Sequence, residues 1–178
     1  MRKNKLEKER VSMKVICKQR NSRMCVICGL DNPFGVRAPF YTMDDGSVMS
    51  CFQFAAHHQS YPGRVHGGII TAMLDEMGLR AMWAKHQNEN DFGVTMSLSS
   101  TFRKPVPYDT GLIARGVLTR ETSRFAVIEA EIYAPGGTLL ANGELKYLKM
   151  DAKLIAADAQ VHEEMPYLIA DGVTEIEL

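Results

Sequence analysis

The spacing of apolar and polar residues along the chain predicts one long helix and six strands. Apolar side chains such as Ile70, Met73 and Leu74 recur at helical spacing from Gly67 to about Lys85. Strand-like patterns cover residues 34–43, 47–54, 93–102, 111–120, 125–134 and 139–150. Short turns separate most of these strands, which favours an antiparallel sheet. A helix of about 19 residues extends roughly 28 Å, so we expect an α+β fold whose antiparallel sheet wraps around one long central helix.

The two ends of the chain differ from this central part in charge. Residues 1–33 are rich in lysine and arginine, and we expect a short helix there that ends near the turn residues 29–33. Residues 151–178 are acidic, with a further helix expected over 152–160. We therefore divide the chain into a basic N-terminal extension (1–33), a domain (34–150) and an acidic C-terminal extension (151–178).

Two interpretations of the charged ends stay open. The basic segment could bind nucleic acid or an acidic partner. Alternatively, both ends are solvated and pair within the molecule or across a dimer, which is the usual behaviour of charge runs. The whole chain has 21 basic and 21 acidic residues, so its net charge gives no reason to expect a nucleic-acid partner.

The composition indicates an ordinary globular protein of 178 residues, with 46% apolar and 24% charged residues. No run approaches the roughly 18 apolar residues of a membrane helix, and the charged start does not resemble a secretory signal. We therefore expect a cytoplasmic protein with no membrane partner. In that setting the cysteines, including the pair Cys25-x-x-Cys28, are expected to be free thiols.

Two glycines stand where the long helix is expected to begin, in the sequence HGGIITAMLDE. The first N–H groups of a helix lack partners within the helix. Gly67 and Gly68 would let another molecule approach those donors closely, which suits a carbonyl oxygen that gains negative charge. Tight packing of the helix start on the sheet is the alternative explanation for this pair.

Asp75 lies in the same predicted helix and has no charged neighbour three or four residues away. It is therefore either a solvated surface residue or a functional carboxylate. Asp75 is eight residues beyond Gly67, about 12 Å along the axis. If both groups act on one carbonyl, they are expected to come from different chains of a two-fold dimer.

This helix start resembles the HGG-x6-D signature of hotdog-fold acyl-CoA thioesterases of the PaaI type. The likeness continues in CVICGLDNPFGV, HHQSYPGRVHGG and SLSSTFRKPVPYDTGLIARGVL, and so covers roughly residues 25–150. The resemblance implies the hotdog fold and hydrolysis of an acyl-CoA, with active sites shared in a homodimer or homotetramer. It implies no cofactor, because CoA is part of the substrate.

The resemblance also implies roles for individual residues. Asp75 matches the catalytic carboxylate, which acts as a general base on water or as a nucleophile on the thioester carbon. The N–H of Gly67 matches the donor that polarises the carbonyl, His66 shapes the loop before it, and Thr95 matches a residue that orients the water. Gln59 and Ser60 are the candidates for a polar residue that the family places near the site, and Gly68 is expected to contact substrate.

Three further features carry weaker signals. Arg103 and Lys104 follow a predicted strand and could bind the CoA phosphates, or could be a solvated strand end. Cys25 and Cys28 could be half of a zinc site or a redox pair. Zinc normally has four ligands and a second such pair is missing, so we expect no metal. The alternatives to hydrolysis are a non-catalytic acyl-CoA-binding hotdog protein and a hotdog dehydratase or hydratase, whose motif the sequence lacks.

Overall fold

The computed structural model describes residues 12–155 and 163–178 of the chain. Its main sheet has eight strands in the spatial order β10-β1-β2-β3-β7-β8-β9-β6, and every pairing in it is antiparallel. The bounds are β1 (Ser12–Lys18), β2 (Tyr41–Met43), β3 (Val48–Phe52), β6 (Gly93–Phe102), β7 (Leu112–Glu121), β8 (Phe125–Ala134), β9 (Thr138–Lys149) and β10 (Glu175–Glu177). Strands β4 (Gln59–Tyr61) and β5 (Arg64–Val65) form a separate small hairpin.

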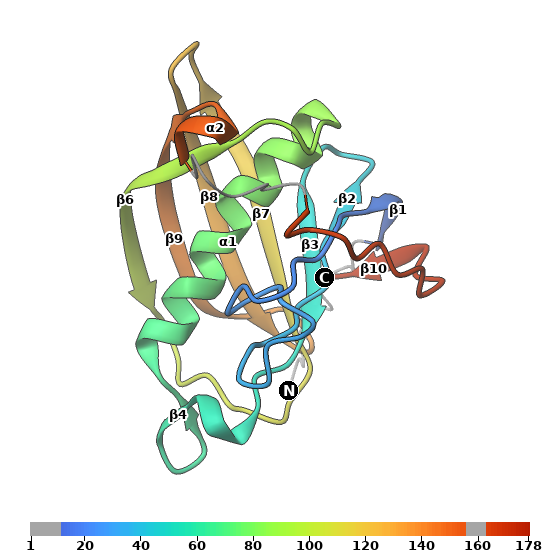
Figure 1. Cartoon of the computed structure of the whole chain (residues 1–178). Helices are drawn as coiled ribbons and strands as arrows, with labels where there is room; N and C mark the ends of the chain where they lie inside the picture. Colours follow the sequence, from blue (N-terminus) through green and yellow to red (C-terminus); the bar gives the residue numbers. More distant parts are fainter. Residues whose placement is uncertain (1–11, 156–162) are drawn as a thin grey trace, which may run out of the picture.

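The long helix α1 (Gly67–His86) lies across one face of the main sheet, in front of β7, β8 and β9 (Figure 1). Its side chains Met73, Leu74 and Met77 are fully buried, together with sheet residues such as Ile128 and Leu145. Burial of such side chains contributes about 1.5–3 kcal/mol each, so the contact between α1 and the sheet forms the main core. The predicted α+β architecture, with an antiparallel sheet around one central helix, is confirmed.

The ends of α1 have clear local causes. The imidazole of His66 accepts a hydrogen bond from the N–H of Gly68 at 2.9 Å and so caps the start of the helix. At the other end, Gln87 adopts the left-handed conformation with φ of 50°, and Lys85 and His86 place basic groups in the last turn. The helix therefore begins and ends within one residue of the predicted bounds.

The expected strand at 34–43 is wrong over most of its length, because only Tyr41–Met43 joins the sheet. The N–H groups of Val36 and Ala38 instead bond to the carbonyls of Val26 and Ile27, in the loop that holds the cysteine pair. Arg37 between them has a φ of 58°, which is incompatible with a regular strand. This segment therefore forms its backbone hydrogen bonds with the N-terminal loop and not with the sheet.

The short helix expected in the first thirty residues is also wrong where the structure describes them. Residues 12–18 form β1, which pairs with β2 on one side and with β10 on the other. The charged ends meet within the molecule, as in the ion pair of Lys18 Nζ with Asp171 Oδ2 at 2.6 Å. Of the helix expected at 152–160, α2 (Ala152–Ile155) is present, and the remainder lies outside the described residues.

The loop expected before α1 contains a short 3-10 helix, η1 (Ala56–His58), followed by the β4–β5 hairpin. Pro62 and Gly63 form its turn, and Gly63 has a φ of 77° that favours glycine. The hairpin ends at Val65, and His66 follows it directly at the start of α1. In the described part of the chain, no helix has the length and apolarity needed to cross a membrane.

Candidate active site

Asp75 lies on α1, half-buried, with its side chain facing β6 and β9. Its Oδ1 accepts a hydrogen bond from Thr95 Oγ1 at 2.7 Å. The hydroxyl of Tyr147 donates to the main-chain oxygen of Asp75 at 2.7 Å and lies 3.3 Å from Oδ1. Within residues 12–155 and 163–178, no lysine, arginine or histidine forms an ion pair with Asp75. The carboxylate is therefore oriented by two neutral hydroxyls and not neutralised by a cation.

The two hydroxyls reach Asp75 because Thr95 on β6 and Tyr147 on β9 are directly paired across the sheet. Paired residues point to the same face of a sheet, here the face that α1 covers. A bulge follows at Met96, since Thr95 pairs with Tyr147 and Ser97 with Lys146, and bulges of this kind often re-aim side chains near functional sites. Burial, and then the charge of Asp75, raise the pKa of Tyr147, so its hydroxyl stays protonated as a donor.

The N-terminus of α1 presents an unpaired donor. The Nδ1 of His66 accepts a hydrogen bond from the N–H of Gly68. The N–H of Gly67 has no acceptor among the described residues. A Cβ atom at Gly67 would lie 3.5 Å from the ring of Phe102, at the end of β6. The free N–H carries the positive end of the helix dipole and is able to bind an oxygen that gains negative charge.

A hollow of about 410 Å³ opens beside this donor, and we refer to it as the cationic hollow. It brings together four of the residues singled out in the sequence, namely Ser60, Gly67, Arg103 and Lys104. Arg64 adds a third cation from β5, and no motif in the sequence marks it. The remaining lining residues are Tyr61, Val65, Ile70, Phe102, Pro105 and Val106. Three cationic side chains together with apolar lining residues suit a ligand that has both phosphate groups and an apolar part.

Gln59 lies at a second hollow, of about 370 Å³, lined by His57, His58, His66 and the apolar residues Val26, Phe34 and Ile69. The Nδ1 of His58 accepts a hydrogen bond from the N–H of Ala55, and its Nε2 forms a hydrogen bond with the carbonyl oxygen of Phe34. Burial lowers the pKa of His58, so it serves as a neutral structural group. The chain therefore places Gln59 and Ser60, adjacent in sequence, at two different hollows.

The predicted site residues thus fall into separate groups within one chain. Asp75 and Thr95 meet near the middle of α1, while Gly67, Ser60 and the cations meet at its start. The eight residues between Gly67 and Asp75 correspond to about 12 Å along the helix. Tyr147 is the functional candidate that sequence reasoning missed, and only the register of β6 against β9 reveals it.

Comparisons with known proteins decide the family. Residues 62–141 match the profile of the thioesterase superfamily, a range that includes Gly67, Asp75, Thr95 and the cations of the hollow. The crystal structure of a thioesterase superfamily protein superposes with a TM-score of 0.63 at 25% identity, over 70% of this chain and 63% of that one. Residues 62–141 are thus a segment of the thioesterase-superfamily type. The antiparallel sheet around a central helix is the hotdog fold of that superfamily, as the sequence predicted.

Further proteins similar to this chain extend the comparison. Acyl-coenzyme A thioesterase THEM4 of Mus musculus is 27% identical over 116 residues, which cover 64% of this chain and 48% of THEM4. The chain therefore spans about half the length of the curated relative that it matches. The PaaI protein from the phenylacetic acid degradation operon of E. coli has a TM-score of 0.57 at 16% identity, over 65% of this chain and 80% of PaaI.

A hypothetical thioesterase protein from Streptococcus pneumoniae TIGR4, solved with coenzyme A, also has a TM-score of 0.57. It is 18% identical, over 64% of this chain and 89% of that one. At this level of identity, the likeness to the E. coli and Streptococcus proteins concerns the fold.

Proposed function

We propose that this protein hydrolyses an acyl-CoA thioester to the free acid and CoA, with Asp75 as the catalytic carboxylate. The observation that carries the proposal is the setting of Asp75, which is half-buried and oriented by the hydroxyls of Thr95 and Tyr147, with no cationic partner among the residues that the structure describes. A carboxylate oriented in this way is placed to act on a bound water or on a carbonyl carbon. The proposal agrees with the acyl-CoA thioesterase activity in the name of the Mus musculus relative.

In the proposed reaction, the free N–H of Gly67 binds the thioester oxygen as negative charge develops on it. Asp75 either takes a proton from water as the water attacks the carbonyl carbon, or attacks that carbon itself. The C–S bond then breaks, and CoA leaves as the thiol after it takes up a proton. If Asp75 attacks the carbon, the acyl group remains on Asp75 as a mixed anhydride, and one water then hydrolyses it to the free acid and restores the carboxylate. Thr95 orients the carboxylate or the water.

The cationic hollow is the proposed site for the phosphates of CoA. Arg64, Arg103 and Lys104 surround it, and Arg103 is held in place by donation from its Nε to Asn142 Oδ1 at 2.9 Å. Charged hydrogen bonds to phosphate are stronger than neutral ones. Because the hollow adjoins Gly67, a CoA held there could bring its thioester to the donor at the helix start. The crystal structure of the Streptococcus protein contains coenzyme A, which supports CoA as the kind of ligand proposed for this hollow.

We further propose that each active site is shared between two copies of the chain. Strand β6 is at the end of the sheet and exposes Met96 and Phe102, each about half accessible. Its Thr95 end lies against Asp75, and its Phe102 end lies against Gly67. Antiparallel pairing of β6 with a second β6 would place the Thr95 end beside the partner's Phe102 end. Asp75 would then serve the Gly67 donor of the partner subunit, in a dimer or in each dimer of a tetramer.

A hydrolysis screen across short, long and aromatic acyl-CoAs tests the activity, with release of the CoA thiol as the readout. We expect turnover of at least one class. Binding of acyl-CoA without turnover would instead indicate a non-catalytic hotdog protein.

A mixing experiment tests the shared site. A chain with Asp75→Asn is combined with a chain carrying Gly67→Val, each inactive alone. If sites are shared, one site of each mixed dimer has both defects and the other has neither, so activity returns. If each chain holds a complete site, every site in the mixture keeps one defect and activity stays absent.

A further inference from the structure

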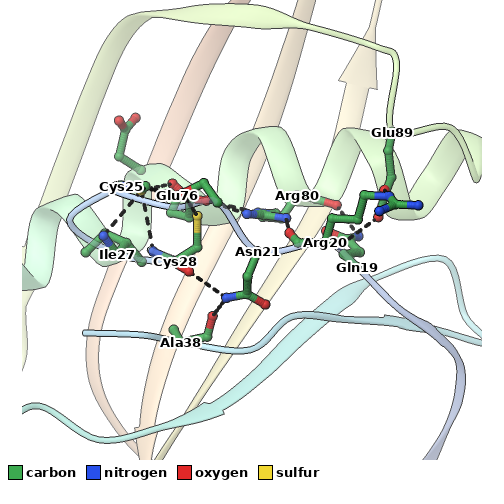
Figure 2. Close-up of polar contacts among 12 residues, drawn as sticks. Gln19, Arg20, Asn21, Cys25, Ile27, Cys28, Ala38, Glu76, Arg80 and Glu89 are labelled. Carbon is green, nitrogen blue, oxygen red and sulfur yellow. Dashed lines mark hydrogen bonds and ion pairs between the residues drawn. The ribbon is translucent and has the colours of Figure 1, made fainter. Parts of the chain in front are cut away.

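A cluster of two cysteines and a glutamate lies on the face of α1 that the N-terminal loop covers. The sulfur atoms of Cys25 and Cys28 and a carboxylate oxygen of Glu76 all lie within 4.8 Å of one another. Cys25 Sγ is 3.5 Å from Glu76 Oε2. Figure 2 shows the two cysteines on the loop and Glu76 on the helix, turned toward one another. Glu76 follows Asp75 directly but points away from it, and the proposed hydrolysis does not use it.

Each of the three potential ligands is already oriented by a neighbour. Arg80 holds Glu76 Oε1 through Nε and Nη2, both at 2.9 Å, and so leaves Oε2 for the cluster. The N–H groups of Ile27 and Cys28 donate to Cys25 Sγ at 3.3 and 3.4 Å. The hydroxyl of Ser22 lies 3.2 Å from Cys28 Sγ. Outer partners of this kind typically orient metal ligands and tune their basicity.

Arg80 itself is rigidly placed. It is fully buried and stacks on the rings of Phe40 and Trp83. Its Nη1 donates to the carbonyl of Arg20 at 2.7 Å (Figure 2). Two thiolates and one carboxylate carry three negative charges, and Arg80 supplies one positive charge. The remaining double negative charge in a mostly buried site matches a divalent cation.

We propose that Cys25, Cys28 and Glu76 bind one Zn²⁺ ion, with water at the fourth position. Thiolate ligands select zinc over magnesium or calcium. In a tetrahedral site with Zn–S of about 2.3 Å and Zn–O of about 2.0 Å, sulfur and oxygen ligands are about 3.5 Å apart, which equals the separation of Cys25 Sγ and Glu76 Oε2. The sequence lacks a second cysteine pair and on that ground predicts no metal, but the structure supplies a third potential ligand from α1.

Such an ion would tie the N-terminal loop to the helix that carries Asp75. Around the cluster, Asn21 Nδ2 already donates to the carbonyls of Cys28 and Ala38 (Figure 2). The ion would therefore stabilise a preformed loop. Its role would be structural, beside the proposed catalytic residues and separate from their chemistry.

The test is metal binding by the whole chain, reduced and stripped of metal, with added Zn²⁺ or Co²⁺. We expect one ion per chain by elemental analysis and an intense thiolate-to-cobalt absorption band. Cys28→Ser should abolish both signals. Glu76→Gln removes a direct ligand and should weaken Zn²⁺ affinity by at least the roughly 10–100-fold that loss of an outer-shell partner costs. Cys17→Ser is the matched control, since Cys17 is an exposed free thiol outside the cluster, and it should bind as the wild type does.

Alkylation of the wild-type chain gives a second readout that does not depend on the folding of any variant. With Zn²⁺ bound, Cys25 and Cys28 should be protected while the exposed Cys17 and Cys51 react. Without metal, Cys25 and Cys28 should react measurably faster. The proposal is overturned if the folded, reduced chain binds no stoichiometric Zn²⁺ or Co²⁺. It is also overturned if added Zn²⁺ leaves the alkylation of both cysteines unchanged.

Discussion

The hydroxyl of Tyr147 lies 2.7 Å from the main-chain oxygen of Asp75 and 3.3 Å from its Oδ1. One side chain on β9 thus contacts both the backbone of the helix and the carboxylate proposed to act in catalysis. Tyr147 is only 4% exposed, and burial and the charge of Asp75 raise its pKa. It therefore remains a donor over the pH range in which enzymes are assayed, and we assign it a positioning role.

Replacement of Tyr147 by phenylalanine removes this donor and keeps the ring. A hydrogen bond to a charged group contributes about 1.5–3 kcal/mol, so we expect kcat to fall by about 10-fold or more. KM for the acyl-CoA should stay near the wild-type value, because Tyr147 does not line the cationic hollow. Steady-state kinetics separate the two constants. Equal loss in kcat and gain in KM would indicate general disruption of the fold.

Gly78 is the helix position against which the Tyr147 ring packs, and a Cβ there would overlap that ring. Alanine normally favours a helix over glycine by about 1 kcal/mol. For Gly78→Ala we nevertheless expect a loss of about 1–3 kcal/mol in the free energy of unfolding, because the core is overpacked. Denaturant unfolding measures it. Gly111→Ala is the matched control, since a Cβ added at Gly111 would meet no atom within 4 Å, and it should be neutral or slightly stabilising.

The cationic hollow predicts a substrate-dependent effect. Arg103→Ala or Lys104→Ala should raise KM for an acyl-CoA several-fold, and less so at high salt, because phosphate contacts are screened. KM for an acyl-pantetheine, which lacks the nucleotide phosphates, should not change. Arg120→Ala serves as control, because Arg120 is exposed on β7 and does not line the hollow. Equal effects on both substrates would contradict the assignment of the hollow to the CoA phosphates.

His86, in the last turn of α1, predicts how stability depends on pH. Its ring contacts Asp91 through Nδ1 at 2.5 Å and Glu121 through Nε2 at 3.0 Å. Burial opposes its charged form, but the hydrogen bonds to Glu121 and Asp91 outweigh burial and raise the pKa of His86 above its ordinary 6.5. The charged form is thus favoured in the folded state. Its stabilisation is fully present below pH 6.5 and is lost as pH rises through the folded-state pKa.

His86→Gln should therefore lower the free energy of unfolding at about pH 6, and this deficit should shrink as the pH is raised. Denaturant unfolding at several pH values gives the comparison. A deficit that grows with increasing pH would show that the neutral ring, not the charged one, stabilises the fold.

The sequence predicted the central helix and the strands of the hotdog domain because their apolar spacing is regular. Residues 93–102 and 125–134 were predicted with the same bounds that the structure has. The segment 34–40 could not be predicted in this way. Ala38 and Phe40 are buried, as strand residues would be. The N–H groups of Val36 and Ala38, however, bond to the loop that contains Val26 and Ile27, and Arg37 adopts a left-handed conformation. Apolar spacing along the chain carries no information on either feature.

In the candidate site, too, some residues could be predicted from the sequence and others could not. Asp75 and Thr95 were found through a resemblance, and the structure places their oxygens 2.7 Å apart. Tyr147 depends on the register between β6 and β9 and on the space left by Gly78. Glu76 joins Cys25 and Cys28 only because the N-terminal loop folds onto α1. These contacts join residues far apart in the chain, which local patterns do not specify.

The most direct test of the central claim is the replacement of Asp75 by asparagine, with hydrolysis and CoA binding measured on the same preparation. We expect kcat to fall by about 10²–10⁴-fold, the usual contribution of a general acid or base, while the dissociation constant of CoA stays unchanged. Glu129→Gln, an exposed carboxylate on β8, should retain full activity. Hydrolysis by the Asp75→Asn protein at the wild-type rate would contradict the assignment of Asp75 as the catalytic carboxylate.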